Sequence, residues 1–153
     1  MIYIRKVTND DVELLFHWAN DINLRKFSLK TDKINWNEHV EWFQKKIDSN
    51  SYILIAETKL GVPVGQIRFD NYNSHFLIDF YVANEYRGRG YGKLLLRNGM
   101  DYVIKERQKV TFKAMVNEMN FPSLNSFLSE GFTLSGQEVL NQKKFFCYFK
   151  DCK

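Results

Sequence analysis

The sequence YVANEYRGRGYGK occupies residues 81–93 and gives the clearest indication of the architecture. It follows an alternating strand pattern that ends near Val82 and precedes a helical pattern that begins near Gly90. The first backbone N–H groups of a helix have no partner inside the helix, so here they point into the loop and form an anion site. Glycines leave room for a phosphate against the backbone, and cations border it. These residues are the glycines Gly88, Gly90 and Gly92 and the cations Arg87, Arg89 and Lys93.

Two well-known phosphate loops do not fit this spacing. A Walker loop requires Gly-x-x-x-x-Gly-Lys followed by Ser or Thr, but Arg87 stands five positions before Gly92, and Leu94 follows the lysine. A dinucleotide loop requires Gly-x-Gly-x-x-Gly near the start of a βαβ unit, whereas these glycines alternate and follow an antiparallel meander. The alternative is a glycine-rich turn that binds nothing. The coincidence of three glycines, three cations and a helix start argues against it.

The composition is typical of one folded domain. A chain of 153 residues that is 44% hydrophobic can build one core and is too short for two ordinary domains, so we expect a single domain over residues 1–153. The net charge of +4 is dispersed, because residues 1–50 are neutral while 51–100 and 101–153 each carry an excess of two positive charges. Such a mild excess does not favour a nucleic-acid partner.

The chain also lacks the pattern of a membrane span or a signal peptide. No apolar run approaches the roughly 18 residues that would cross a bilayer, and the first residues alternate in polarity. We therefore expect a soluble, cytoplasmic protein with no membrane partner. Cys147 and Cys152 lie close together without metal-ligand spacing around them, so we expect reduced thiols and no metal.

Hydrophobic periodicity predicts the element order βααβββαβαββ. Residues 51–82 predict an antiparallel meander, and the strand after the long helix is expected to lie parallel to the strand that ends at Val82. The predicted strands are 2–8, 51–58, 64–71, 75–82, 109–116, 132–135 and 143–150, and the predicted helices are 12–20, 36–47, 90–106 and 122–129, with a polar segment at 21–33.

Two motifs resemble those of the GNAT N-acetyltransferases. Arg87-x-x-Gly90-x-Gly92 is similar to their acyl-CoA pyrophosphate signature, and Phe80-Tyr81-Val82 is similar to the strand before it. Asn120-x-x-Ser123-x-x-x-Phe127-x-x-x-Gly131-Phe132 is similar to their second motif. The element order is similar as well, so the resemblance covers essentially the whole chain. It implies an α/β (α+β) GNAT fold, with a mixed, mostly antiparallel twisted sheet of about seven strands, flanked by about four helices and splayed at the central parallel pair.

The resemblance further implies acetyl-CoA as co-substrate, without a metal. Backbone N–H groups from Arg87 to Lys93 would hold the pyrophosphate, and main-chain groups near Tyr81 and Val82 would pair with pantetheine and the thioester carbonyl. Asn120 would lie beside the pantetheine arm. The expected cofactor-binding residues are Tyr81, Val82, Arg87, Gly88, Arg89, Gly90, Tyr91, Gly92, Lys93, Asn120 and Phe127.

Phe127 departs from the family pattern. Many members have a tyrosine there, whose hydroxyl protonates the departing CoA thiolate. A thiol pKa of about 8.5 makes the thiolate a tolerable leaving group near neutrality, so direct transfer survives the loss. Tyr81, Tyr148 or a water are alternative proton donors. An acyl-CoA-binding regulator without catalytic activity is the non-enzymatic alternative.

Asp79 and Tyr81 are the expected catalytic residues, because polar side chains on the strands of the cleft can take the amine proton. By period-two counting they share one strand face with His75, for which an exposed turn position is favoured. The sequence leaves two descriptions of the Asp79 side chain open: a partly buried acid that faces the cleft, and a surface carboxylate. Asp70 and Glu118 are further candidates.

The first two predicted helices resemble those of members that acetylate the 4-amino group of nucleotide-linked aminodideoxy sugars, as in the pseudaminic acid pathway. The resemblance rests on Trp18-x-Asn20, Arg25 and His39-x-x-Trp42-Phe43. It implies a UDP-linked amino sugar as the acceptor, with Arg25 and His39 near its diphosphate. Trp18 and Phe43 are favoured as core residues.

Other acceptors remain open. A protein N-terminus is one, as in the ribosomal-protein branch of the family, and polyamines or antibiotics are others. A cationic acceptor favours an acidic cleft, whereas residues 1–50 are only neutral in charge. A homodimer is compatible with the sequence, which fixes neither acyl length nor oligomeric state.

Overall fold

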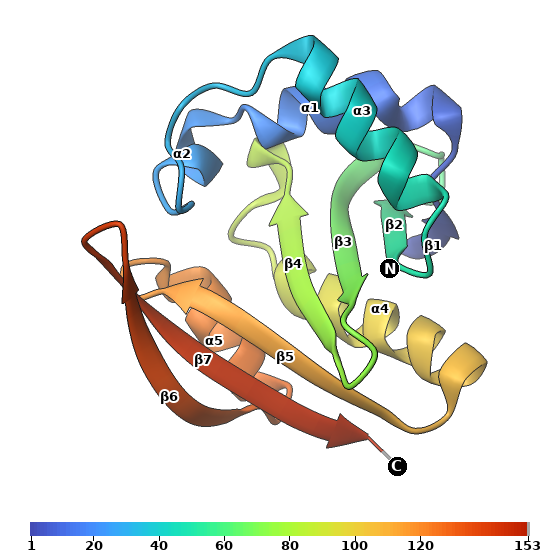
Figure 1. The fold of residues 1–153 in the computed structure, drawn as a ribbon. Helices are drawn as coiled ribbons and strands as arrows, with labels where there is room; N and C mark the ends of the chain where they lie inside the picture. The colour runs from blue at the N-terminus through green and yellow to red at the C-terminus, as the bar shows by residue number, and fades with distance from the viewer. Residues whose placement is uncertain (153) are drawn as a thin grey trace.

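Seven strands form one sheet in the computed structural model, which describes residues 1–152. Their order across the sheet is β1-β2-β3-β4-β5-β7-β6 (Figure 1). The strands are β1 (Tyr3–Lys6), β2 (Tyr52–Glu57), β3 (Pro63–Asn71), β4 (Phe76–Val82), β5 (Val110–Asn117), β6 (Thr133–Leu140) and β7 (Lys143–Cys152). The helices are α1 (Val12–Ala19), α2 (Ile22–Arg25), α3 (Trp36–Ile47), α4 (Tyr91–Arg107) and α5 (Phe121–Ser129), with short 3-10 turns at Asn9–Asp11 and Asn84–Tyr86.

The strands β4 and β5 form a parallel pair, which confirms the prediction, and the other described pairs are antiparallel. The parallel pairing covers only the first three residues of β4, Phe76–Ile78, against Phe112–Ala114. Beyond it the two strands diverge toward their C-terminal ends (Figure 1). β4 stays paired with β3 up to Val82, so its last residues have no strand on their other side. The sheet is therefore splayed at its centre, as the resemblance implied.

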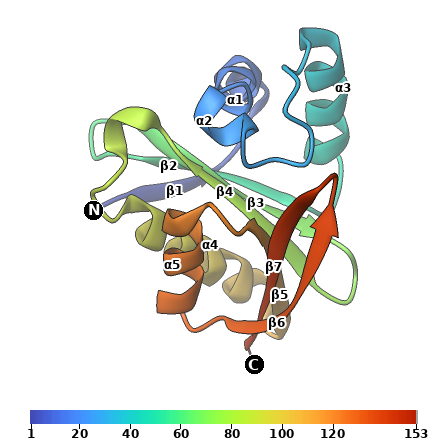
Figure 2. The same cartoon turned by 90° about the vertical axis from the view of Figure 1, so that its left-hand side faces the viewer.

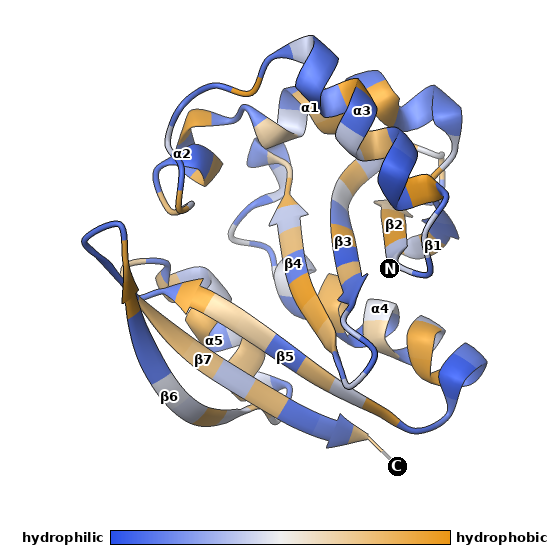
Figure 3. Ribbon diagram, viewed as in Figure 1, coloured by the Kyte–Doolittle hydropathy of each residue, from blue (hydrophilic) through white to orange (hydrophobic). Residues whose placement is uncertain are grey.

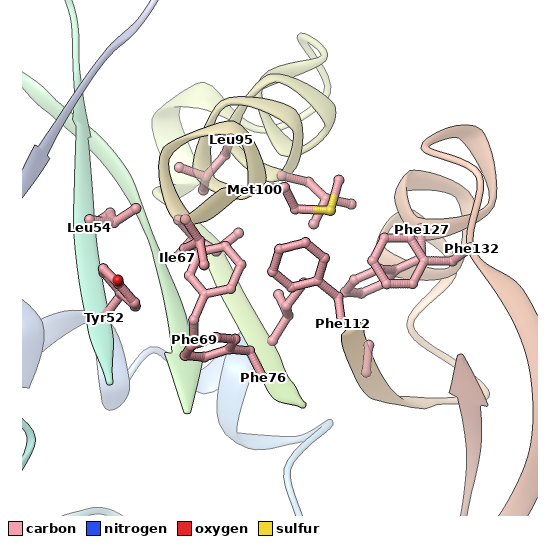
Figure 4. Close-up of a cluster of buried hydrophobic side chains, with 14 of the residues drawn as sticks. Tyr52, Leu54, Ile67, Phe69, Phe76, Leu95, Met100, Phe112, Phe127 and Phe132 are labelled. Atoms are coloured by element: carbon pink, nitrogen blue, oxygen red, sulfur yellow. The ribbon is translucent and has the colours of Figure 1, made fainter. Parts of the chain in front are cut away.

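Helices cover both faces of the sheet (Figure 2). α4 and α5 pack on one face over the larger hydrophobic core, which Figure 4 shows in close-up; it includes Ile67, Phe69, Leu95 and Phe112. α1 and α3 cover the other face over a smaller cluster that includes Leu15, Ile55 and Tyr81. Trp18 and Phe43 belong to this second cluster, which agrees with their assignment as core residues.

Polar residues alternate with apolar residues along β3 (Figure 3). The side chains of Ile67 and Phe69 join the core under α4, while Gln66 and Arg68 lie on the opposite face, toward α1 and α3. A strand that buries both of its faces does not usually carry such a polar row. The row marks the site described below. Among the described residues, no helix is long and apolar enough to cross a membrane.

Two elements differ from those predicted. The polar segment 21–33 contains the short helix α2, because the Asp21 side chain accepts a hydrogen bond from the Asn23 N–H at 2.9 Å and caps a helical turn; the structure thus has five α-helices instead of four. β6 extends to Leu140 instead of ending at residue 135. Its residues are mostly exposed at the sheet edge, so the sequence there shows no apolar alternation, and the pairing with β7 fixes the strand.

Candidate active site

A cleft of about 580 Å³ opens where β4 and β5 diverge. Polar residues of β3 and β4 line it, together with residues of β5 and α5 on one side and of α1 and α3 on the other. The residues from Asn20 to Ile34, called the 20–34 segment below, also contribute to the lining. The cleft therefore lies at the splay, where the resemblance places the reacting groups.

The two ends of the 20–34 segment, Asn20 and Ile34, are hydrogen-bonded to each other and form its neck. The segment is also tied to both halves of the sheet. The Asn20 side chain donates to the Ile34 carbonyl at 3.0 Å and accepts from the Ile34 N–H at 2.7 Å. On the β5 and β7 side, the Asn117 amide donates to the Phe27 carbonyl at 3.5 Å, and the Lys143 ammonium donates to the Ser28 carbonyl at 2.8 Å. On the β4 side the anchor is Asp21, which is described below. The segment thus bridges the splay.

The predicted anion site has the backbone geometry that it requires. Gly88 and Gly90 have φ angles of +76° and +82°, which favour glycine, and Gly90 is the N-cap of α4. The backbone N–H groups from Gly88 to Lys93 donate no hydrogen bond within residues 1–152. Gly92 has an additional role in packing, because a Cβ there would lie 3.2 Å from Ser126 Oγ and 3.4 Å from a Phe80 ring carbon.

Of the three cations predicted beside this loop, one is already paired with a carboxylate. The Arg87 guanidinium lies 2.9 Å from the Asp21 carboxylate, so its side chain does not stand free at the rim. Arg89 and Lys93 form no ion pair among the described residues. They are the cations available to an anion on the loop.

The Tyr81 side chain is buried and already engaged. Its hydroxyl donates to Asp21 Oδ2 at 2.7 Å, and its ring lies 5.4 Å from that of Trp18. Burial and the Asp21 carboxylate raise the pKa of the hydroxyl well above its ordinary value. This bonding does not suit Tyr81 for the base role expected from sequence. The Val82 carbonyl is engaged as well, since Arg87 Nε donates to it at 2.8 Å.

Asp79 lines the cleft on the same strand face as Tyr81. Its side chain is 55% exposed, and its Oδ2 lies 3.4 Å from the Arg68 guanidinium, directly across from it on β3. Both descriptions left open by the sequence therefore hold in part, because Asp79 is a solvent-accessible carboxylate that faces the cleft. It can accept a proton from an amine or a water bound there.

The other acid–base candidates lie outside the cleft lining. Asp70 is buried and paired with the Lys46 ammonium at 2.6 Å and with Arg68 at 3.2 Å. His75 stacks on Tyr72 at the β3–β4 turn, which agrees with its favoured assignment as a turn residue. Glu118 follows β5 and is likewise absent from the lining.

Phe127 and Asn120 both lie in the cleft wall. Phe127 is buried, and its ring centroid lies 5.5 Å from that of Phe80 and 5.0 Å from that of Phe132. Tyr148 stacks behind it at 6.3 Å but is not part of the lining. Asn120 is the N-cap of α5 and accepts from a backbone N–H with its side chain. These residues contribute a mainly apolar wall with one amide.

The two residues predicted to contact the acceptor line the same cleft. His39 Nε2 lies 2.8 Å from the Val12 carbonyl, which only accepts, so this nitrogen carries the proton. Burial lowers the pKa of His39 below its ordinary value, so the ring is neutral near pH 7 and does not supply positive charge for a diphosphate. The Arg25 guanidinium donates to the carbonyls of Ala19 and Lys30, while its buried Nε lacks a partner in the described chain.

A second cavity of about 490 Å³ lies beside the first and shares Arg25 with it. Its lining includes three cations, Arg25, Lys26 and Lys33, and no carboxylate. Within residues 1–152 no cluster of three or more His, Cys, Asp or Glu side chains could hold a metal ion.

The sequence reasoning missed three polar residues of the cleft. Gln66 is only 9% exposed, and its Oε1 has no hydrogen-bond partner among the described residues. Arg68 lies over the Trp42 ring at 5.3 Å and pairs with Asp79. Glu38 lines the cleft without an ion pair in the described chain. The alternation of Gln66 and Arg68 with buried apolar residues on β3 was the available signal for the first two.

Comparisons with known proteins agree with this geometry. A model of the acetyltransferase (GNAT) domain family matches residues 2–133. An uncharacterised protein of Methanocaldococcus jannaschii is 29% identical in an alignment 150 residues long that covers 90% of this chain; the chain spans only 29% of that relative's length. Acetyltransferase PseH of Campylobacter jejuni is 24% identical over 135 residues, covering 87% of this chain and 83% of that protein.

Among solved structures, spermidine N-acetyltransferase from Vibrio cholerae, crystallised with CoA and spermine, superposes with a TM-score of 0.88. It is 16% identical and covers 99% of this chain and 95% of its own, so the likeness shows the fold. The family model covers most of the chain, including the glycine loop and the second motif. The chain therefore belongs to the GNAT acetyltransferase family.

Proposed function

We propose that this chain transfers an acetyl group from acetyl-CoA to the primary amine of a nucleotide-linked amino sugar. Family membership makes the chain an acetyl-CoA-dependent N-acetyltransferase. The proposal concerns the acceptor and the residues that bind and activate the two substrates.

Acetyl-CoA is assigned to the glycine loop and the splay. The free N–H groups from Gly88 to Lys93 suit a pyrophosphate, and Arg89 and Lys93 add unpaired positive charge beside it. From there the pantetheine arm would enter the cleft along the open edge of β4, past Asn120 and Phe127. The thioester would then lie within reach of an amine bound over β3 and β4.

In the reaction, the amine nitrogen forms a bond to the thioester carbon, and the C–S bond breaks to release CoA as a thiolate. We assign the proton lost by the amine to Asp79, directly or through a water, because this carboxylate is accessible in the cleft. Tyr81 instead holds Asp21. The wall residue Phe127 carries no hydroxyl, so water protonates the thiolate.

The observation that carries the acceptor proposal is the second cavity. Its three cations and lack of carboxylates suit a polyanion, and Arg25 connects it to the cleft. An acceptor with an amine at one end and a diphosphate at the other fits both cavities at once. The similarity to PseH over 87% of the chain and the elements Trp18-x-Asn20 and His39-x-x-Trp42-Phe43 support the same class.

The test is release of free thiol from acetyl-CoA with four acceptors: a UDP-linked 4-amino sugar, the same sugar without UDP, an N-terminal peptide and spermidine. We expect the UDP-linked sugar to react with the highest kcat/KM. Equal reaction of the free sugar would contradict the proposed role of the basic cavity. A higher kcat/KM with the peptide would indicate an N-terminal acetyltransferase. A higher kcat/KM with spermidine would indicate a cationic acceptor.

A charge reversal tests the cavity itself. Lys33→Glu should raise KM for the UDP-linked sugar several-fold and leave KM for acetyl-CoA unchanged, because the lysine lines only the second cavity. Lys59→Glu, in the β2–β3 turn, is the matched control and should change neither constant. An unchanged sugar KM in Lys33→Glu would remove the cavity from the acceptor site.

The lack of a hydroxyl at Phe127 favours one other function, an acyl-CoA-binding regulator without turnover. Such a protein would bind CoA but release no thiol with any of the four acceptors. The thiol-release assay therefore distinguishes the two functions.

A further inference from the structure

Asp21 lines neither cavity, yet it joins the two regions assigned to the substrates. It lies in the 20–34 segment at the start of α2, where its Oδ1 accepts from the Asn23 N–H at 2.9 Å. Its other oxygen, Oδ2, accepts from the Tyr81 hydroxyl at 2.7 Å and from Arg87 Nη2 at 2.9 Å. One carboxylate thus contacts α2, the end of β4 and the residue that opens the glycine loop.

Arg87 is held on several sides. Its Nε donates to the Val82 carbonyl at 2.8 Å, and its guanidinium carbon lies 5.2 Å from the centre of the Tyr81 ring. A guanidinium fixed by a carboxylate, a carbonyl and an aromatic face has little freedom to rotate. The backbone that follows it, from Gly88 to Lys93, is the proposed pyrophosphate site.

The Asp21 side chain is largely shielded from water, with 16% of it exposed, so its bonds to Arg87 and Tyr81 are less screened than a surface ion pair. Burial alone would raise the pKa of Asp21, but the hydrogen bonds from Tyr81, Asn23 and Arg87 outweigh it and leave the pKa below its ordinary value. The carboxylate is therefore ionised near pH 7, as the contact with Arg87 requires.

The other anchors of the 20–34 segment run elsewhere. Asn117, Asn141 and Lys143 hold the backbone of residues 26–29 from β5, the β6–β7 turn and β7, and the neck consists of the two bonds between Asn20 and Ile34. None of these side chains contacts the glycine loop among the described hydrogen bonds and ion pairs. The direct polar link from the loop to the segment in the described chain is Asp21.

We propose that Asp21 is a positioning residue that transmits occupancy of the glycine loop to the 20–34 segment. A pyrophosphate bound on the loop restrains the backbone next to Arg87, and the firmly held Arg87 side chain passes this restraint through Asp21 to the start of α2, near Arg25. Binding of acetyl-CoA thereby orders the acceptor region, and by reciprocity an acceptor that orders the segment strengthens acetyl-CoA binding by the same factor. The inference rests on the proposed function for the places of the two substrates.

The experiment needs CoA alone as the probe, so it does not depend on the identity of the acceptor. Backbone hydrogen exchange of residues 20–34 is measured with and without saturating CoA in the wild-type chain and in Asp21→Asn, Arg87→Gln and Asp32→Asn. Asp32 lies in the same segment, and its side chain makes no hydrogen bond or ion pair in the described chain, which makes it the matched control. Calorimetry gives the CoA affinity of each protein.

We expect CoA to slow exchange in the segment by about fivefold in the wild type and in Asp32→Asn, in the range of coupling between linked sites. In Asp21→Asn and Arg87→Gln, CoA at saturation should leave the exchange rates of the segment unchanged. If Asp21→Asn fails to fold, Arg87→Gln decides, because it keeps the bond between Asp21 and Tyr81. A purely structural role would raise exchange in the free protein but preserve the slowing by CoA.

CoA-dependent slowing that persists in either Asp21→Asn or Arg87→Gln would overturn the inference while leaving the proposed function intact. A wild-type chain that binds CoA without any slowing would overturn it as well. A wild-type chain that binds no CoA would overturn the proposed function and the inference together.

Discussion

Gly90 shows how one residue can serve both the backbone and a ligand. Its φ of +82° is unfavourable for a residue with a Cβ, but that Cβ would meet nothing within 4 Å. Gly90→Ala should therefore destabilise the fold only through backbone strain, by about 1–2 kcal/mol, and should weaken CoA binding because the methyl group occupies the phosphate site. Urea denaturation and calorimetry measure the two effects.

Gly61 offers a matched control for this prediction. It has the same φ of +82° and the same open surroundings, but it lies in the turn between β2 and β3. Gly61→Ala should lose a similar free energy of unfolding and retain the wild-type CoA affinity. Equal CoA affinity in both variants would show that the phosphate does not rest against Gly90.

Individual side chains also show where sequence reasoning stops. The motif places Arg87 beside a phosphate site, but its partner Asp21 lies 66 positions earlier in the chain, and Glu130, the partner of Arg97, lies 33 positions later. Periodicity and local spacing give the face of an element, and they contain no information on which distant carboxylate an arginine meets. For the same reason Tyr81 was predicted on the correct strand face while its bond to Asp21 was not.

Among the elements, α3 is joined to α1 in part through His39. The neutral ring donates to the Val12 carbonyl and packs between aromatic side chains of both helices. Burial lowers the pKa of His39 below its ordinary value of 6.5, so the unfolded chain binds a proton more readily than the folded one. The contribution of His39 is therefore complete above pH 6.5 and is lost as the pH falls from there toward the folded pKa.

His39→Gln retains a donor for the Val12 carbonyl and removes the titration. Urea denaturation at pH 7, 6 and 5 should show that the free energy of unfolding of this variant falls less steeply on acidification than that of the wild type. The remaining slope in this range includes His75, whose pKa is also lowered by burial and by Lys113. An unchanged slope would mean that His39 does not titrate differently in the folded chain.

α5 is attached to the core through Phe127. Its ring is buried between those of Phe80, Phe132 and Tyr148, so Phe127→Ala should lower the free energy of unfolding by about 3–5 kcal/mol. Phe121→Ala, at a position 59% exposed on the same helix, should change it by less than about 0.5 kcal/mol. Phe127→Tyr should leave turnover similar or raise it. Full stability of Phe127→Ala would contradict the alignment of the second motif.

Across the whole molecule, the sequence predicted the order of elements along the chain, the parallel pair and the glycine loop, because these follow from periodicity, connection handedness and motif spacing. It missed α2 and most of β6, whose stability comes from a single cap and from an edge pairing. It also missed the basic second cavity, since Arg25, Lys26 and Lys33 surround a space only after the neck between Asn20 and Ile34 closes. Enclosed shapes depend on such tertiary contacts.

Because the 20–34 segment bridges the splay, it also affects which acceptors reach the cleft. Residues 24, 25 and 27–29 line the same cleft as Asp79, and hydrogen bonds from Asn117 and Lys143 fasten this part of the segment to the β5 and β7 half of the sheet. We expect a slender acceptor to leave these bonds intact and a bulky acceptor that displaces the segment to break them. The same holds for the acetylated product, so we expect the hydrogen bond between Lys143 and the Ser28 carbonyl to open in every turnover of a wide substrate.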